Sequence, residues 1–573
     1  MSSVFYHNIS IHDRVESGRV HCWRRIANFI EKACRERAEL VLLYRCALFH
    51  LDWRYCMTKQ PVELYLLNDD AEVDEFIALL LPNSADKSRI KDLFDRFIKP
   101  VSVLVENHYV DKVYRDSYYK YFSNKHFDAS RNCRRISFYT GDIAFEDFFS
   151  EEGHQRLQEC FIGFAVLKPI SPGCLGRTYL DPKKINIDRC YVRTTRFNPT
   201  ILGVRFEIDS FPFSSQDTET MTCAETSVWS ILEYYGTRYA DYKVAYPSEI
   251  VDTILNRSNE RVLPSKGLSL VQISSLVKSF GFSPRIYSRG IGAFFDPEFK
   301  RILHYYVESG IPVALSVKAK QNGVSVGHAV VCIGHSDKME TNITPKNSNG
   351  IHFVNSADFF PQYVIMDDNQ VPFAVQDYTA VTTYQDPVID GIVVPLYKRI
   401  FLEATEADTI SRNILFHEKM GVVNALNQLN DLIDSGKVEG IHRYGESNPM
   451  VIRLFLTSSR QFKRFRSLNY VNERIDKPIA MVYSQLPMPK FIWVAEISLQ
   501  DEYMNKRVLG EIVLDATAST YSGLESLISI HYPGFFAWRR PNEPLEKLVQ
   551  MLSHYTLPIA YPLYENNLSA GGI

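Results

Sequence analysis

One cysteine stands in a setting that suits nucleophilic chemistry, in the stretch QDTETMTCAETSVWSILEYYG of residues 216–236. Thr222 and Glu225 fit a capping box, which would make Cys223 the first residue of a helix that ends at Gly236. At that place the unpaired backbone N–H groups and the positive end of the helix dipole favour a thiolate. Most free cysteines are instead small buried hydrophobes, so the interpretation of Cys223 as a nucleophile needs partners elsewhere in the chain.

A thiol nucleophile requires a general base, and the base requires a group that orients it. His328 follows Gly327 at the start of the apolar run GHAVVCIGH, and Asp367 lies at the end of the next strand-like run, QYVIMDD. A carboxylate at that place could accept the Nδ1–H of His328. A single histidine on a strand is usually a satisfied core residue. That explanation accounts less well for the occurrence of Cys223, His328 and Asp367 in one domain, each at the end of an expected helix or strand.

The order of these segments resembles that of a known family. The succession C-x-x-x-S-x-W…YYG, GLSLVQISSLVKSFGF, ESGIPVALSV, GHAVVCIGH and a hydrophobic strand ending in Asp is similar to the bacteriocin-processing (C39-like) branch of the papain-fold cysteine peptidases, over about residues 205–400. The resemblance implies that Cys223 is the nucleophile, His328 the general base and acid, and Asp367 the orienting group. It also implies a helix with the cysteine, packed on an antiparallel sheet with the histidine and the aspartate.

The family also has a glutamine before the cysteine, whose amide helps the backbone N–H of the cysteine to hold an oxyanion. Gln216 is the matching residue, although it lies one residue further from Cys223 than the glutamine of the family usually does. The papain branch proper orients its histidine with Asn. Asp368 and Asn369, which follow Asp367, are therefore alternative orienting groups.

The chain as a whole has nearly balanced charges. Its 573 residues include 64 Lys and Arg against 67 Asp and Glu, a formal net charge of -3. This balance provides no general field for nucleic acid or for anionic lipid, so we expect neither nucleic acid nor a membrane as a partner. The expected partner is a peptide or protein substrate, and the regions on either side of the cysteine and histidine segments could bind a further protein.

The cysteines and the known metal and nucleotide motifs limit the class of protein further. The 10 cysteines form no CxxC pair, and the last is Cys332, which favours reduced thiols in a cytoplasmic protein. The N-terminal segment lacks the basic and apolar parts of a signal peptide, and the most apolar run, AELVLLYRCALFHLDW, is too short to span a bilayer. No HExxH or GxxxxGK[ST] motif occurs, so we expect no cofactor and no metal.

Two other features attract notice but favour no catalytic role. GVSVG, residues 323–327, matches the G-x-S-x-G elbow of serine hydrolases, but the elbow precedes a helix and a strand-like run follows here. His335 comes seven residues after His328. Side chains an odd number of positions apart on a strand point to opposite faces, so we expect a core or surface role for His335.

Patterning divides the chain into three regions: residues 1–200, a mixed α/β region of unknown role; residues 201–400, for which the resemblance implies a papain-like (C39-like) peptidase domain; and residues 401–573, an α+β region of unknown role. Helices followed by antiparallel strands in the middle region predict an α+β fold. Further helical patterns occur at residues 21–49, 247–255, 269–282 and 406–433.

Three functions remain open at this point. The first is a thiol-dependent peptidase or amidase. The second is a transamidase or acyltransferase, in which an amine rather than water resolves the thioester. The third is an inactive papain-like scaffold between two interaction domains. The presence of cysteine, histidine and aspartate favours the two enzymes. We also predict that one of the flanking regions packs against the rim of the cleft, either to restrain access to Cys223 or to recognise substrate.

Overall fold

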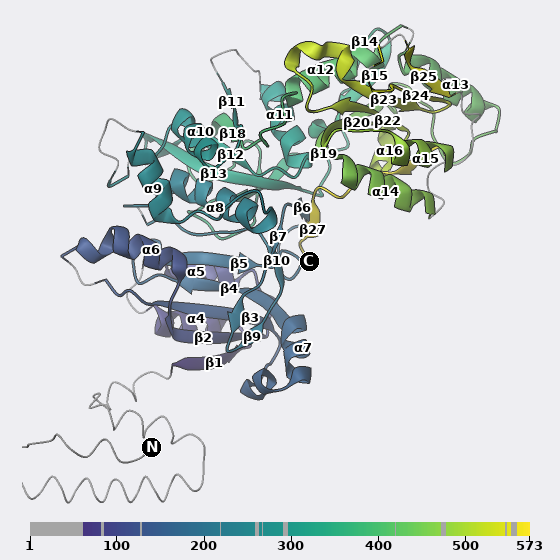
Figure 1. Cartoon of the computed structure of the whole chain (residues 1–573). Coiled ribbons are helices and arrows are strands. Elements are labelled where there is room, and N and C mark those ends of the chain that lie inside the picture. Colours follow the sequence, from purple (N-terminus) through teal and green to yellow (C-terminus); the bar gives the residue numbers. More distant parts are fainter. Residues whose placement is uncertain are drawn as a thin grey trace, which may run out of the picture. The chain divides into compact units, whose positions relative to one another are not determined.

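The computed structural model describes most of the chain from residue 61 onward: residues 61–81, 85–126, 129–217, 219–257, 263–265, 267–289, 296–418, 420–471, 477–541, 543–544, 547–551 and 559–573. Contacts divide the chain into two units, Met1–Glu63 and Leu64–Ile573, and nearly all described residues belong to the second. The helical pattern at residues 21–49 lies outside the described residues. The second unit belongs to the mixed α+β class, as predicted, with largely antiparallel sheets and helices that flank them (Figure 1).

The first sheet is built from the N-terminal part of this unit, and its strands follow one another in the order β1-β2-β3-β4-β5. These strands are β1 (Val62–Leu67), β2 (Val101–Tyr109), β3 (Cys133–Thr140), β4 (Phe161–Leu167) and β5 (Leu175–Leu180). The connecting helices are α4 (Asp70–Leu80), α5 (Lys87–Phe94), α6 (Lys112–Lys120) and α7 (Glu151–Cys160). Side-chain caps fix where several of them begin. Asp111, for example, accepts from the N–H groups of Val113 and Tyr114 at the start of α6.

The second sheet is built mainly from the middle of the chain, in the order β11-β18-β12-β13-β16-β17. Its strands are β11 (Arg285–Ser288), β12 (Val313–Gln321), β13 (Val324–Ser336), β16 (Gln362–Met366), β17 (Ala374–Asp377) and β18 (Gln385–Val394). Two short strands extend it, because β6 (Cys190–Val192) pairs with both β13 and β27 (Ser569–Gly571). Its helices are α8 (Cys223–Arg238), α9 (Pro247–Leu255), α10 (Leu270–Ser279) and α11 (Asp296–Glu308).

The third sheet is built mainly from the C-terminal part, in the order β14-β15-β19-β20-β22-β23-β24-β25. Its strands are β14 (Lys346–Ser348), β15 (Ile351–Asn355), β19 (Met450–Ser458), β20 (Phe491–Leu499), β22 (Gly510–Asp515), β23 (Leu527–Tyr532), β24 (Phe535–Trp538) and β25 (Val549–Met551). Its helices are α12 (Ala404–Leu415), α13 (Val423–Asp434), α14 (Ser459–Val471), α15 (Lys477–Gln485) and α16 (Gln500–Met504). The first two strands come from the chain between β13 and β16, so the second and third sheets share one stretch of sequence.

Shorter elements complete the described part of the chain. Three small ladders join β7 (Thr195–Phe197) to β10 (Ile208–Ser210), β8 (Thr200–Ile201) to β9 (Val204–Arg205), and β21 (Arg507–Val508) to β26 (Tyr561–Pro562). The 3-10 helices are η2 (Phe122–Asn124), η3 (Phe145–Phe149), η4 (Ser356–Phe359) and η5 (Thr520–Ser526). In the described residues, every helix is too short or too polar to cross a bilayer.

The second sheet is buried on both faces, because its central strands are apolar at successive positions. On β12, Val313 and Leu315 join a core with α11 and the third sheet. Ala314, between them, joins a different core with α8 and the first sheet. Successive side chains of a strand point to opposite faces, so a continuous apolar run such as that of β12 serves two cores at once. The helix α8 is thereby held between the first and second sheets.

Two predicted helix boundaries are wrong. The helix that starts at Cys223 does not end at Gly236 but continues to Arg238. Gly236 has another role, because a Cβ at this position would lie 2.4 Å from the backbone nitrogen of Val244. The residue therefore allows the following chain to pack against α8. The helical pattern at 406–433 forms two helices, α12 and α13, rather than one.

Candidate active site

The local structure around Cys223 follows the prediction in part. Cys223 is the first residue of α8, and Thr222 is its N-cap. The capping box is not formed, because the Thr222 hydroxyl donates to the carboxylate of Glu225 and accepts no helix N–H. The Ser265 hydroxyl donates to the other oxygen of Glu225 at 2.5 Å. Glu225 is buried and accepts from both hydroxyls, and the Thr222 side chain does not cap the start of α8.

The structure brings the predicted histidine and aspartate together. His328 lies on β13 and Asp367 directly follows β16, and the His328 Nε2 is 2.8 Å from the Asp367 Oδ1. The thiol of Cys223 interacts electrostatically with the same ring. Since Nε2 is occupied by Asp367, Nδ1 is the nitrogen left for the sulfur. The prediction that Asp367 accepts from Nδ1 is therefore wrong: strand β16 approaches the ring from the Nε2 side, and α8 approaches it from the other.

Several donors hold the Asp367 carboxylate in place. Its Oδ1 accepts from the Asn369 N–H at 3.0 Å, and its Oδ2 accepts from Gln370 Nε2 at 2.9 Å and from the Thr382 hydroxyl at 3.1 Å. Burial by itself raises the pKa of Asp367, but the hydrogen bond with His328 and these further bonds lower it below its usual value. Asp367 is thus an ionised group in a fixed orientation.

The electrostatics of the pair favour a charged imidazole. Burial by itself lowers the pKa of His328, but the interactions with Asp367 and Cys223 raise it to about 11. The edge of the ring also meets Tyr384, with the two ring centres 5.2 Å apart. An imidazolium beside a cysteine favours the thiolate form of that cysteine. The arrangement can therefore supply a nucleophilic sulfur and, next to it, a proton donor.

The alternative orienting groups lie close by but bind the ring less directly. The nearest oxygen of Asp368 is 3.7 Å from the His328 Nε2, and neither of its carboxylate oxygens has a hydrogen-bond partner among the described residues. Burial raises the pKa of Asp368 to about 7, against the opposing effect of the His328 charge. The amide nitrogen of Asn369 lies 3.5 Å from the same ring nitrogen. Asp367 is therefore the group best placed to orient His328.

These carboxylates also bear on metal binding. Among the described residues, His328, Asp367 and Asp368 are the group whose donor atoms lie close enough together, within 4.8 Å, to share a metal ion. A metal at this place would have to displace the proton between the His328 Nε2 and Asp367, which are already 2.8 Å apart. The donor set is better matched to a proton than to a cation.

Gln216 reaches the site by a route that the sequence did not indicate. Its side-chain amide donates to the Oδ1 of Asn369 at 2.8 Å, and Asn369 in turn donates to the hydroxyl of Tyr384 at 3.0 Å. Gln216 therefore borders the imidazole through Asn369.

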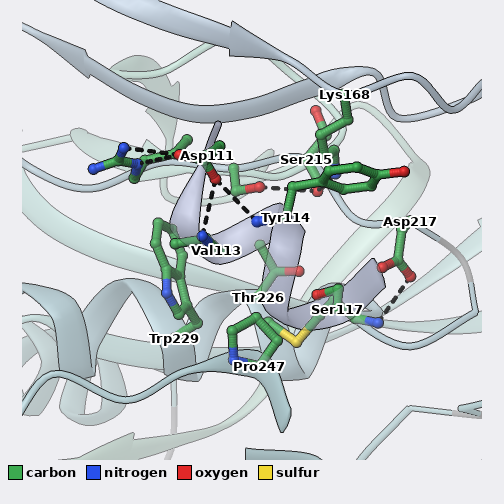
Figure 2. A pocket seen from close by; sticks show the side chains of 13 residues that line it. Asp111, Val113, Tyr114, Ser117, Lys168, Ser215, Asp217, Thr226, Trp229 and Pro247 are labelled. Carbon is green, nitrogen blue, oxygen red and sulfur yellow. Dashed lines mark hydrogen bonds and ion pairs between the residues drawn. The ribbon is translucent and has the colours of Figure 1, made fainter. Parts of the chain in front are cut away.

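The loop that carries Gln216 is supported by the first sheet. Lys168, just after β4, donates to the carbonyl of Ser215 at 2.8 Å, and Arg89 on α5 donates to the Ser215 hydroxyl at 2.9 Å. Figure 2 shows Lys168 beside Ser215, and both line the same small cavity as the α8 residues Thr226 and Trp229. No local pattern in the sequence indicates these contacts, because their partners are 47 and 126 positions apart.

The space between these elements is too small for a substrate. A cavity of about 20 Å³ is lined by residues of α6, of the loop 214–217 and of α8, among them Tyr114, Ser215 and Thr226 (Figure 2). That volume accommodates about one water molecule. The contact between the first sheet and α8 is therefore closely packed.

The two features for which we expected no catalytic role are the segment 323–327 and His335. The segment 323–327 lies in a hairpin between β12 and β13, so no helix follows its serine. His335 is buried, with Nδ1 2.7 Å from the Ser336 carbonyl and Nε2 2.7 Å from Glu308. Both ring nitrogens of His335 are therefore occupied.

Comparison with known proteins adds no assignment: no model of a protein family matches this chain, and no curated protein matches it. A function must therefore be argued from the contacts around Cys223.

The His328–Asp367 pair leads to a prediction on stability. A histidine whose pKa rises from about 6.5 in the unfolded chain to about 11 in the folded protein stabilises the fold fully below the lower value, and this contribution is lost as the pH rises toward the higher one. The wild-type protein should therefore lose stability relative to His328→Gln between pH 7 and pH 10, by up to about 1.4 kcal/mol per pH unit. Urea unfolding of both proteins across this range measures the difference, and a difference that stays constant would contradict the raised pKa.

Proposed function

We propose that the protein is a thiol-dependent peptidase or amidase that acts on a peptide or protein substrate. The observation that carries the proposal is that the imidazole of His328 is hydrogen-bonded to Asp367 and interacts electrostatically with the thiol of Cys223. Each of the three residues lies at the end of an element or within a strand, so the backbone fixes their relative positions. This is the combination of nucleophile, base and orienting group that covalent catalysis requires.

The chemistry proceeds in two halves. The Cys223 sulfur attacks the carbonyl carbon of the scissile amide, and the carbonyl oxygen becomes an oxyanion. As the C–N bond breaks, the His328 imidazolium donates its proton to the leaving amine, and a thioester remains on Cys223. Water then attacks the thioester while His328 accepts a proton from it. The new carboxylate leaves, and the thiolate is restored. Asp367 holds the ring throughout.

The oxyanion would be held at the start of α8. The N-cap residue Thr222 makes no side-chain capping bond there, and N–H groups at a helix start can bind a negatively charged oxygen. Gln216 provides a second donor if its amide turns from Asn369 toward the sulfur during the reaction. Preorganised donors of this kind supply a large share of the rate enhancement in acyl transfer.

The architecture supports the finer assignment of a papain-like fold to the middle region. The helix α8 starts with the nucleophile and packs against β13, and β13 and β16 bring the histidine and the aspartate to that start. Contacts of Arg89 and Lys168 with Ser215 support a further point: the N-terminal region helps to build the site, in addition to any role in restraint or recognition.

Selective alkylation tests the proposed nucleophile. Near neutral pH, iodoacetamide should modify Cys223 faster than every other described cysteine, by at least about tenfold over Cys332. Burial raises the pKa of Cys332 to about 12, so that thiol is almost entirely protonated. Peptide mapping of the native protein by mass spectrometry after short exposures measures both rates. Modification of Cys223 no faster than that of Cys332 would rule out an activated thiol.

A further inference from the structure

The loop before the nucleophile is fixed by a set of contacts from the first sheet. The Ser215 N–H donates to the Leu175 carbonyl at 2.8 Å, and the Lys168 ammonium donates to the Ser215 carbonyl at 2.8 Å. Ser215 is thus bound at both sides of its backbone by the hairpin of β4 and β5. Arg89 adds a third bond, to the Ser215 side chain.

The next residue, Gln216, is held by close packing. Gly173, in the same hairpin, has a φ of +92°, and a Cβ there would lie 2.1 Å from the carbonyl oxygen of Gln216. Any larger residue would push this carbonyl away. The hairpin is itself held, because the carboxylate of Asp86 accepts from the N–H groups of Gly173 and Cys174 at 3.0 and 3.2 Å.

These contacts form a continuous path to the catalytic ring. Lys168 binds the carbonyl of Ser215, which belongs to the same peptide group as the nitrogen of Gln216. The Gln216 amide binds Asn369, and Asn369 lies 3.5 Å from the His328 Nε2. A change in the orientation of the 215–216 peptide group would therefore move the Gln216 side chain relative to His328 and Cys223.

The ammonium of Lys168 is suited to this task. Lys168 lines the small cavity whose side chains are drawn in Figure 2. Burial lowers the pKa of Lys168, whereas the charge of Asp217 opposes that effect. A cationic donor binds a carbonyl more strongly than a neutral donor does, and more so where water is scarce.

We propose that Lys168 is a positioning residue of the active site, which fixes the 215–216 peptide group so that Gln216 can stabilise the oxyanion. The inference rests on the proposed function, and it assigns to the N-terminal region a part in catalysis. Lys168 touches neither substrate nor Cys223 in this scheme, and it acts through Ser215 and Gln216.

Two reactions of Cys223 separate this role from a purely structural one. Acylation by p-nitrophenyl acetate passes through an oxyanion, forms a thioester and releases p-nitrophenolate. Alkylation by iodoacetamide displaces iodide directly and forms no oxyanion. Lys168→Met should slow acylation by about tenfold, because the Gln216 amide would no longer be well placed to stabilise the oxyanion. Alkylation should be unchanged, because it forms no oxyanion. Lys168→Arg, which keeps a cationic donor, should recover part of the acylation rate.

Lys184→Met is the matched control. Lys184 lies in the same region, its ammonium donates to the Glu159 and Phe161 carbonyls at 2.6 and 3.0 Å, and burial lowers its pKa as well. Neither of these two hydrogen bonds of Lys184 involves Ser215 or Gln216. Lys184→Met should leave both reactions of Cys223 unchanged. Hydrogen exchange should rise in the 214–217 segment of Lys168→Met and not in that of Lys184→Met.

The possible failures are distinguishable. If wild-type Cys223 is alkylated but never acylated, the proposed function fails, and the hydrogen-exchange comparison still tests the role of Lys168 in holding the loop. If Lys168→Met acylates at the wild-type rate, the positioning role is wrong. It is equally wrong if acylation and alkylation fall together, because Lys168 then only supports the fold.

Discussion

A His328→Gln variant should acylate Cys223 with p-nitrophenyl acetate about 10³-fold more slowly than the wild-type protein. Glutamine is neutral and cannot exchange a proton near neutral pH, so the thiol loses the cation that favours its thiolate form. The variant also removes the imidazole that is hydrogen-bonded to Asp367 and interacts with the Cys223 thiol. The release of p-nitrophenolate, followed by absorbance in the first turnover, measures the rate.

His335→Gln provides a matched control for this change. His335 lies on the same strand, is also buried and also contacts a carboxylate, that of Glu308 at 2.7 Å. Both of its ring nitrogens are occupied by Ser336 and Glu308. The control should therefore lose stability but keep the acylation rate within about threefold, after correction for the folded fraction. Equal losses in the two variants would mean that His328 serves the fold and not the thiol.

Asp367→Asn should slow acylation on the order of 10²-fold, the second largest effect that we expect. The asparagine side chain fits the same space but carries no charge, so it stabilises the imidazolium less and allows the ring to adopt the wrong tautomer. The bonds from Gln370 and Thr382 to the position 367 side chain would also be rearranged. The same burst measurement gives the rate.

Asp368→Asn separates the two neighbouring carboxylates. Asp368 is 3.7 Å from the ring nitrogen Nε2, and within the part of the chain that the structure describes its oxygens have no hydrogen-bond partner. Removing its charge should change the acylation rate by less than about threefold. If Asp368→Asn is the slower of the two variants, Asp368 is the orienting group and Asp367 is its support.

Local signals in the sequence predicted several elements well. Pro247 at the first position and Glu249 at the third define the start of α9, which occupies the predicted residues. Ser269 caps α10 by a full capping box with Gln272, and Gly281, with a φ of +102°, follows its end. Signals of this kind act within a few residues, so a single sequence contains them in full.

The contacts between distant segments could not be predicted in this way. Which ring nitrogen of His328 binds Asp367 is decided by the positions of β16 and α8 around β13. The continuation of α8 beyond Gly236 depends on how the chain at Val244 packs against this helix. The capping box at Thr222 fits the sequence pattern, but Ser265 and burial of Glu225 change its hydrogen bonds. Each of these outcomes is decided by packing and not by local pattern.

The most direct test of the central claim follows the fate of oxygen from the solvent. The full-length protein is incubated with a mixed library of peptides in water enriched in ¹⁸O, and the products are analysed by mass spectrometry. A thiol peptidase should yield new carboxyl termini that carry one ¹⁸O, and a Cys223→Ala variant should yield none. New amide products with an added amine, and no ¹⁸O, would identify an acyltransferase instead. Cleavage that persists in Cys223→Ala, or no product of either kind from the wild-type protein, would contradict the account.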